Sequence, residues 1–299
     1  MVQWRGRRQS GNIRDLRGQR SQAGAGAGLA LLPLVVRFLG FRGVIVIALI
    51  LGAIWLFGGN PMGIVNMLLG GGGQPVVSQA QIPPGQEEEA EFAAVILGDT
   101  EDVWRAVFAE QGGTYPEPTM VLYAEGANSG CGFASSAVGP FYCPVDQTIY
   151  LDLTFFNELA NSLGAQGDFA PAYVIAHEVG HHVQNTLGVL NEADRQRVGL
   201  SQTAQNEVQV QVELMADCFA GVWATRADRM AGILEPGDIE EGMQAASAVG
   251  DDTLQRRAQG HVVPDSFTHG SAAQRTEWFM RGYRSGSIQD CDTFAAGTP

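Results

Sequence analysis

Residues His177-Glu178-Val179-Gly180-His181-His182 place two imidazoles four positions apart, with a carboxylate directly after the first. On a helix, His177 and His181 share one face and can reach a single ion. Glu178 is rotated by about 100° from His177, which directs its carboxylate to a water on that ion rather than to the ion. The preceding residues, Tyr173-Val174-Ile175-Ala176, are apolar. The chain must therefore fold around a largely buried helix that carries a polar site.

This helix has plausible ends in the sequence. Pro171 suits a first helical turn, and Gly188 can end the helix in a left-handed cap. We expect a helix over about 171–187. Its motif, HExxH, is the arrangement of zinc hydrolases, and the alternative is a helix that carries solvated histidines.

A catalytic Zn²⁺ needs a third protein ligand, for which Glu213 is the best candidate. It begins Glu213-Leu214-Met215-Ala216-Asp217 in a second apolar stretch. Glu213 and Asp217 lie four apart and share a helix face, so one can bind Zn²⁺ while the other accepts a hydrogen bond from a ligating histidine. Two surface carboxylates on an amphipathic helix are the alternative.

HEVGHH followed by ELMAD looks like the glutamate-ligated branch of zinc metallopeptidases. The segments at 131–133, 139–144, 217–221 and 268–271 (CGF, GPFYCP, DCFAG and THGS) resemble the membrane-anchored neutral zinc metallopeptidase family of bacteria. The resemblance covers most of the chain, including its arginine-rich start. It implies a zincin-like peptidase fold with one Zn²⁺ and leaves the substrate open.

The expected mechanism uses a water activated by Zn²⁺, which His177, His181 and Glu213 hold, and Glu178 as general base. His269, in Thr268-His269-Gly270-Ser271, is the candidate that stabilises the oxyanion, by residue type and by the resemblance. The rivals for that role are Tyr150, Tyr173 and Tyr283, and a structural His269 is the alternative. His182 and His261 receive no role.

The charge is divided along the chain. Residues 1–42 hold eight arginines and one aspartate, and the remainder is acidic, which argues against nucleic acid as a partner. Residues 43–86 contain no charged side chain. We expect a transmembrane helix over 43–63 and an arginine-rich cytoplasmic segment over 1–42, with the catalytic domain on the extracytoplasmic side of the cell membrane. A cleaved secretory signal is the alternative.

Glycines 70–73 and the prolines before Glu87 indicate a flexible tether over 64–90. The peptidase domain is then expected over 91–299. Its fold is expected to be α+β and dominated by helices, with a small sheet. The strand expected over 147–153 is a candidate for aligning a peptide substrate, with an ordinary internal strand as the alternative.

Four cysteines in an exported domain suggest disulfides, and four cysteines allow three pairings. We favour Cys131 with Cys143 and Cys218 with Cys291, and free buried thiols are the alternative.

Three classes of function stay open. The first is a membrane-anchored zinc endopeptidase acting on polypeptides. The others are a zinc hydrolase of another amide bond in the cell envelope and a binding scaffold without activity. The intact Glu178 argues against the scaffold, because a structural zinc site needs no general base.

Overall fold

A four-stranded sheet forms one side of the domain in the computed structural model, which describes residues 2–18, 82, 85–124, 126–135 and 139–295. Its strands are β1 (Ile13–Asp15), β2 (Thr119–Tyr123), β5 (Phe141–Cys143) and β6 (Thr148–Asp152). Their order is β1-β2-β6-β5, in which β5 alone is antiparallel to its neighbour. Strand β5 is thus an edge strand.

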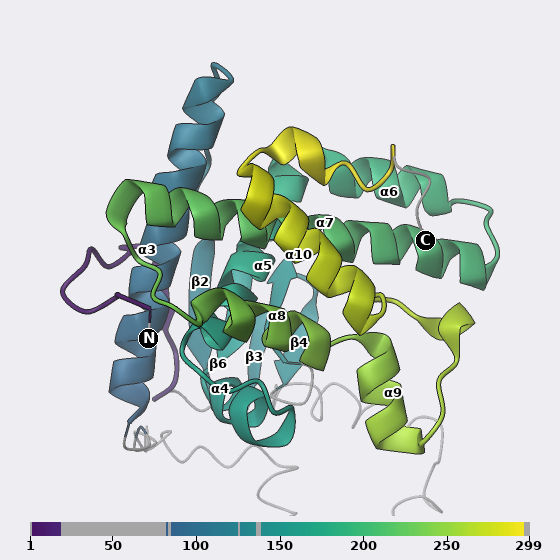
Figure 1. Cartoon of the computed structure of the whole chain (residues 1–299), viewed down its shortest axis with the longest axis horizontal. Coiled ribbons are helices and arrows are strands. Elements are labelled where there is room, and N and C mark those ends of the chain that lie inside the picture. Colours follow the sequence, from purple (N-terminus) through teal and green to yellow (C-terminus); the bar gives the residue numbers. More distant parts are fainter. Residues whose placement is uncertain (1, 19–81, 83–84, 125, 136–138, 296–299) are drawn as a thin grey trace, which may run out of the picture. The chain divides into compact units, whose positions relative to one another are not determined.

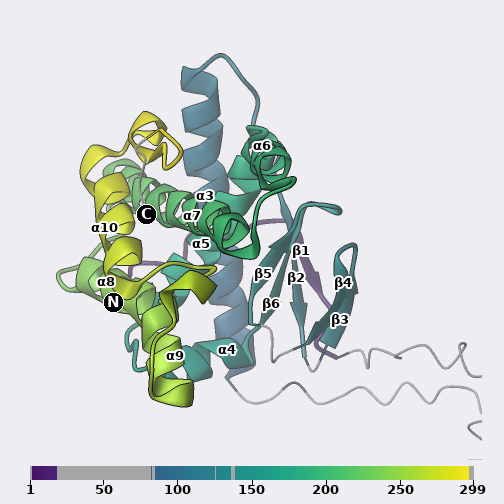
Figure 2. The ribbon, with the colours of Figure 1, turned by 90° about the vertical axis from the view of Figure 1, so that its right-hand side faces the viewer.

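The two faces of the sheet are covered differently (Figure 2). Met120 and Leu122 of β2 belong to the main core with the helices, whereas Val121 and Tyr123 face the hairpin of β3 (Gly126–Ser129) and β4 (Gly132–Ser135). The strand is buried on both faces, as its apolar sequence favours.

The helices make up most of the domain, so the fold is α+β with helices dominant (Figure 1). They are α3 (Gln86–Glu110), α4 (Thr154–Asn157), α5 (Phe169–Thr186), α6 (Val189–Arg197), α7 (Gln202–Ala231), α8 (Asp238–Ala248), α9 (Asp251–Gln259) and α10 (Ala272–Ser285), with short turns η2 (Glu158–Ser162), η3 (Pro264–Ser266) and η4 (Ile288–Cys291). The expected helix over 171–187 corresponds to α5. Gly188 adopts the left-handed conformation after it, as predicted.

Close helix packing holds α5, α7 and α10 together. A Cβ at Gly180 of α5 would lie 3.0 Å from the Ala216 carbonyl oxygen of α7. At the crossing of α7 with α10, a Cβ on Gly221 would lie 2.0 Å from the Phe279 carbonyl oxygen, and one on Gly282 would lie 1.9 Å from that of Cys218. Only glycine permits this approach, which brings three helices to one site.

The sequence predicted that residues 1–42 form a segment separate from the domain. Residues 2–18, named here the N-terminal strap, instead form part of it. They belong to the same compact unit as residues 81–299. Val2 and Trp4 are buried in the main core, and strand β1 pairs with β2. The described part of the folded domain therefore includes residues well before residue 91.

Arginines of the strap pair with acidic residues of α3, which explains why an arginine-rich sequence joins the fold. Arg7 lies 2.7 Å from the buried Asp99, and Arg8 lies 2.9 Å from the buried Glu101. These two carboxylates can be buried because each has an arginine as its charged partner. Composition alone did not reveal these pairs.

Within the described residues, no helix combines the length and apolar character that a bilayer crossing requires. The transmembrane helix predicted over 43–63 and most of the tether predicted over 64–90 lie outside the described residues. Helix α3 begins at Gln86, so the end of that tether is helical.

Both predicted disulfides are present, Cys131 with Cys143 and Cys218 with Cys291. The first joins the β3–β4 hairpin to the edge strand β5, and the second joins α7 to η4. The strand expected over 147–153 corresponds to β6, and its predicted role in aligning a peptide substrate was wrong. Strand β6 lies between β2 and β5, so its backbone is already paired on both sides.

Candidate metal centre and cleft

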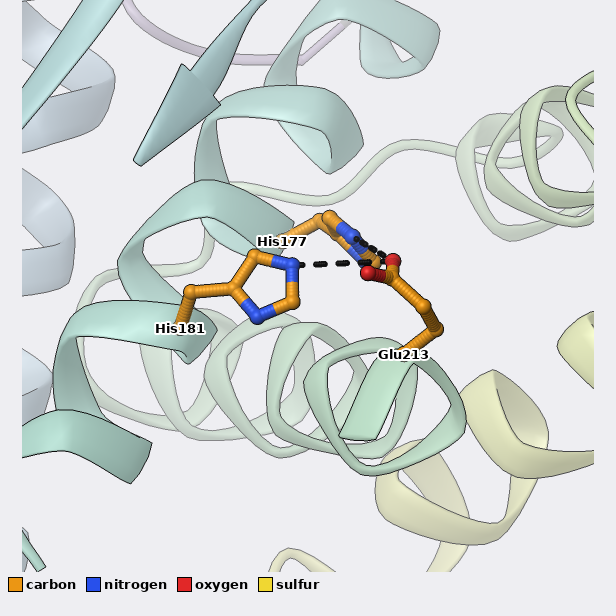
Figure 3. A group of neighbouring side chains, drawn as sticks. All are labelled: His177, His181 and Glu213. Carbon is orange, nitrogen blue, oxygen red and sulfur yellow. Dashed lines mark hydrogen bonds and ion pairs between the residues drawn. The ribbon is translucent and has the colours of Figure 1, made fainter. Parts of the chain in front are cut away.

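His177, His181 and Glu213 converge from two helices (Figure 3). The Nε2 atoms of His177 and His181 lie 3.2 Å and 3.6 Å from Glu213 Oε2. Neighbouring ligand atoms of a tetrahedral Zn²⁺ site are about 3.3 Å apart, given bond lengths near 2.0–2.2 Å. The three atoms therefore have a separation suited to Zn²⁺.

Hydrogen bonds on the far side of each imidazole favour the same interpretation. His177 Nδ1 lies 2.8 Å from Asp217 Oδ1, and His181 Nδ1 lies 2.9 Å from Gln184 Oε1. Because both partners are acceptors, each Nδ1 carries a proton, so that each Nε2 can offer a lone pair to a metal ion. Two lone pairs facing the Glu213 carboxylate suit a cation between them.

Asp217 is fully buried and has several partners. Arg275 of α10 donates to both carboxylate oxygens, from Nε at 2.8 Å and from Nη2 at 2.9 Å. The hydroxyl of Tyr173 donates to Oδ1 as well. Charge-assisted bonds from a forked guanidinium fix a carboxylate in both position and orientation. Asp217 can thus hold the His177 ring rigidly.

Two carboxylates, Glu213 and Asp217, dominate the electrostatics of the cluster. Burial lowers the pKa of His177, but the charge and hydrogen bond of Asp217 outweigh it and raise that pKa to about 9. Burial also opposes ionisation of Glu213, yet the neighbouring imidazoles hold its pKa well below the usual range. The cluster thus favours a positive charge, from protons or from a metal ion.

The remaining oxygen of Glu213 accepts a hydrogen bond of 2.8 Å from Gln209 Nε2. Gln209 in turn contacts Arg197 of α6. The carboxylate therefore has one oxygen that faces the imidazoles and one that is held by its own helix, which fixes its orientation.

The cluster opens into a cleft of about 600 Å³. Glu178 lines this cleft together with His177, His181 and Glu213. The edge strand contributes Phe141 and Tyr142 to the cleft wall, and other contributors are Pro140, Phe155, Val174 and Leu254. The predicted general base, the candidate ligands and a free strand edge thus border one space.

His269 also lines the cleft and is held by Asp251 at the start of α9. Asp251 Oδ2 accepts the backbone N–H groups of Thr268, His269 and Gly270 at 2.6–3.0 Å, and Oδ1 lies 3.2 Å from His269 Nδ1. The hydrogen bond to Asp251 raises the pKa of His269, with burial opposing. Half of the His269 side chain remains exposed.

The three tyrosines that rivalled His269 have other surroundings. Tyr150 faces the hairpin and donates its hydroxyl to Asp146. Tyr173 borders the cleft, but its hydroxyl donates to Asp217. Tyr283 is not among the residues that line the cleft. Of the four candidates, His269 has the polar group best placed for a substrate.

Sequence reasoning missed Arg275 and Asp251. Arg275 lies in Ala272–Ser285, a helix with two further arginines, so that one buried arginine has no distinctive pattern. Asp251 begins Asp251-Asp252 at the start of α9, which is typical of ordinary helix capping. The one available signal was that two carboxylates on a buried helix, Glu213 and Asp217, require a cation nearby, which an arginine can supply.

Comparisons with known proteins give a family and close relatives for this chain. Residues 2–294 match the profile of the family described as "Putative neutral zinc metallopeptidase". The Escherichia coli K12 protein named "Uncharacterized protein YpfJ" is 44% identical over 296 residues, which cover 98% of this chain and 99% of that protein. The Mycobacterium tuberculosis H37Rv protein named "Uncharacterized protein Rv2575" is 40% identical over 263 residues, or 81% of this chain and 85% of that protein.

No solved structure matches the chain significantly. The family match starts at residue 2 and so includes the strap that the fold incorporates. By this match and by the identity to the relatives, the chain belongs to the neutral zinc metallopeptidase family.

Proposed function

We propose that this protein is a zinc-dependent endopeptidase with a zincin-like catalytic domain. The observation that carries the proposal is the convergence of His177 Nε2, His181 Nε2 and Glu213 Oε2 on the cleft that Glu178 borders. Three protein ligands with room for a fourth are typical of catalytic rather than structural zinc sites.

Zn²⁺ in this site would lower the pKa of a bound water and polarise the carbonyl of the scissile peptide. Glu178 accepts the proton of the attacking water and transfers it to the leaving amine nitrogen. Asp217 keeps the proton of His177 on Nδ1, so that Nε2 remains available as a ligand. His269 donates a hydrogen bond from Nε2 to the oxygen on which negative charge develops.

The substrate backbone aligns along β5, the edge strand beside the site. Phe141 and Tyr142 line the cleft, and β5 pairs with β6 on one side. An extended peptide can add to such an edge through main-chain hydrogen bonds. This alignment holds residues on both sides of the scissile bond, which favours cleavage within a chain.

We also propose that the domain acts outside the cytoplasm at the cell membrane. Two disulfides join its elements, and such bonds persist in oxidising compartments. The apolar residues 43–63 are the candidate membrane attachment. The substrate is then a polypeptide of the cell envelope.

The test compares the wild type with Glu178→Gln on the full chain, because the strap belongs to the domain. We expect about one Zn²⁺ per chain in both, and casein cleavage by the wild type alone. Glu158→Gln is the matched control, since Glu158 is another carboxylate of the cleft. It should cleave like the wild type.

Two outcomes would contradict the proposal. A folded chain without Zn²⁺ would refute the metal site. Zn²⁺ binding without cleavage of casein or of a mixed peptide pool would leave a hydrolase of another amide bond, or a binding scaffold.

A further inference from the structure

His182, the last residue of the HEVGHH motif, makes contacts of its own and contributes no ligand atom to the cluster. It is 1% exposed. Its Nε2 lies 2.6 Å from the carbonyl oxygen of Pro116, and its Nδ1 lies 3.0 Å from the hydroxyl of Tyr142. A carbonyl oxygen only accepts, so Nε2 donates and Nδ1 accepts from the tyrosine.

The same network includes a third contact. Asn185 Nδ2, one turn further along α5, donates to the Tyr142 hydroxyl at 3.0 Å. The rings of Tyr115 and Tyr142 pack edge-on against the His182 ring, at 5.6 Å and 5.4 Å between centroids. With the proton on Nε2, each ring nitrogen of His182 has one hydrogen-bond partner.

These contacts join three elements. Tyr142 is the central residue of the edge strand β5, Pro116 precedes β2, and His182 directly follows the candidate ligand His181 on α5. The helix that carries the metal ligands is thus fastened to the strand that borders the cleft.

We infer that His182 is a positioning residue that fixes the edge strand β5 relative to the metal ligands. The inference rests on the proposed function, in which β5 aligns the substrate. Because His182 points away from the metal, it acts through Tyr142 rather than on the reacting atoms. Its loss should impair alignment of an extended peptide more than the chemical step.

The experiment uses Tyr142→Phe and His182→Leu in the full chain, with His182→Gln as the conservative variant that retains a donor and an acceptor. For an extended fluorogenic peptide we expect KM to rise about tenfold and kcat to change less than about threefold. Zn²⁺ content should be unchanged. His182→Gln should recover part of the KM.

Hydrogen exchange provides a readout that does not need activity. In Tyr142→Phe, the amides of 141–143 should exchange faster, while those of α5 keep their protection. Slow exchange at β5, or a loss of kcat with unchanged KM, would overturn the inference. If His182→Leu does not fold, Tyr142→Phe still tests it. Failure of the wild type to cleave peptides would refute the proposed function and leave the exchange result intact.

A separate observation concerns the N-terminal strap. Arg17, next to the last described residue of the strap, donates from Nη1 to the carbonyl oxygen of Gln86 at 2.7 Å, at the start of α3. Chain positions 17 and 86 are therefore neighbours in space. The apolar sequence 43–63 lies between them.

A single membrane crossing between these positions would place the strap and the domain on opposite sides of the bilayer. The strap cannot then supply β1 or bury Trp4. We propose that the strap and the peptidase domain lie on the same side of the membrane. Residues 2–18 then share the location of the domain, whereas the sequence predicted a cytoplasmic location for residues 1–42.

Single thiols in the strap and the body test this topology. All four native cysteines are in disulfides, so an added thiol is the one free thiol. Gly11→Cys suits the strap, since a Cβ there meets no atom within 4 Å, and Val198→Cys suits the body, since Val198 is 81% exposed. Sealed vesicles that contain the full chain are treated with a membrane-impermeant maleimide before and after lysis.

We expect the two thiols to react alike. Either both are labelled in sealed vesicles, or both are protected until lysis. Labelling of one thiol and protection of the other in sealed vesicles would overturn the proposal.

Discussion

Two histidines that line the cleft, His177 and His269, each pair with an aspartate, and the surroundings of the two pairs differ. His177 and Asp217 are buried, and Arg275 and Tyr173 hold the carboxylate from two further positions. The exposed His269 instead pairs with Asp251, whose other oxygen accepts three backbone N–H groups of the same loop.

The difference suits different tasks. Side chains from three helices fix His177, and a metal ligand requires such rigidity. A single loop carries His269. Its Nε2 can therefore move to donate a hydrogen bond to an oxygen of the substrate on which negative charge develops. We therefore expect a metal-binding role for His177 and a catalytic role for His269, set by what holds each aspartate.

The largest expected effect is on the buried pair. Arg275→Met leaves Asp217 buried without its cation, which should lower the free energy of unfolding by about 3–5 kcal/mol. Urea denaturation measures it, with the exposed Arg257→Met as the control. A loss below about 1 kcal/mol would show that Arg275 does not support this site.

Asp217→Asn should weaken Zn²⁺ affinity about 10- to 100-fold, because the His177 ring loses its charged partner. Competition with a chromophoric chelator measures the affinity. Asp251→Asn serves as the matched variant and should bind Zn²⁺ like the wild type. Equal losses in both variants would remove the distinction between the two pairs.

His269→Ala should lower kcat about 10²-fold and leave Zn²⁺ content unchanged, as expected for loss of one oxyanion donor. Steady-state cleavage of a fluorogenic peptide measures kcat. An unchanged kcat would return His269 to a structural role.

The pH dependence should separate His269 from its partner. The hydrogen bond to Asp251 raises the pKa of His269, so the imidazolium donor is present below that pKa and is lost as pH rises through it. The alkaline limb of kcat/KM should therefore move to lower pH in Asp251→Asn. A limb at the wild-type position would argue that another group titrates.

The smallest expected effect is that of Tyr173→Phe, which removes one hydrogen bond to Asp217. We expect a loss of about 1.5 kcal/mol in unfolding free energy. Zn²⁺ affinity should fall less than in Asp217→Asn. A larger fall in affinity would mean that the tyrosine, rather than Arg275, fixes the carboxylate.

The metal cluster could be predicted from sequence because its residues follow helical spacing. His177 and His181 are four apart, as are Glu213 and Asp217, and each pair shares one helix. The packing of α5 on α7 has no such spacing, and Glu213 was inferred from the need of Zn²⁺ for a third protein ligand.

Contacts without a local period could not be predicted. Strand β1 consists of Ile-Arg-Asp, too short to show alternation, and its partner begins at Thr119. The order of strands has no periodic signal either, which is why β6 rather than β5 was expected to align the substrate. Asp251 and Arg275 have ordinary helical contexts, and only the tertiary structure reveals their partners.

The strap also has a consequence for folding. Its residues are synthesised before the rest of the described domain, yet β1 pairs with a strand made about 100 residues later, and the main core closes only after α7. Contacts so distant in sequence form slowly, because loop closure must precede their gain in stability. A nascent chain therefore carries an unpaired strand and an exposed Trp4 for most of its synthesis, and holding these residues soluble becomes a requirement for making the enzyme.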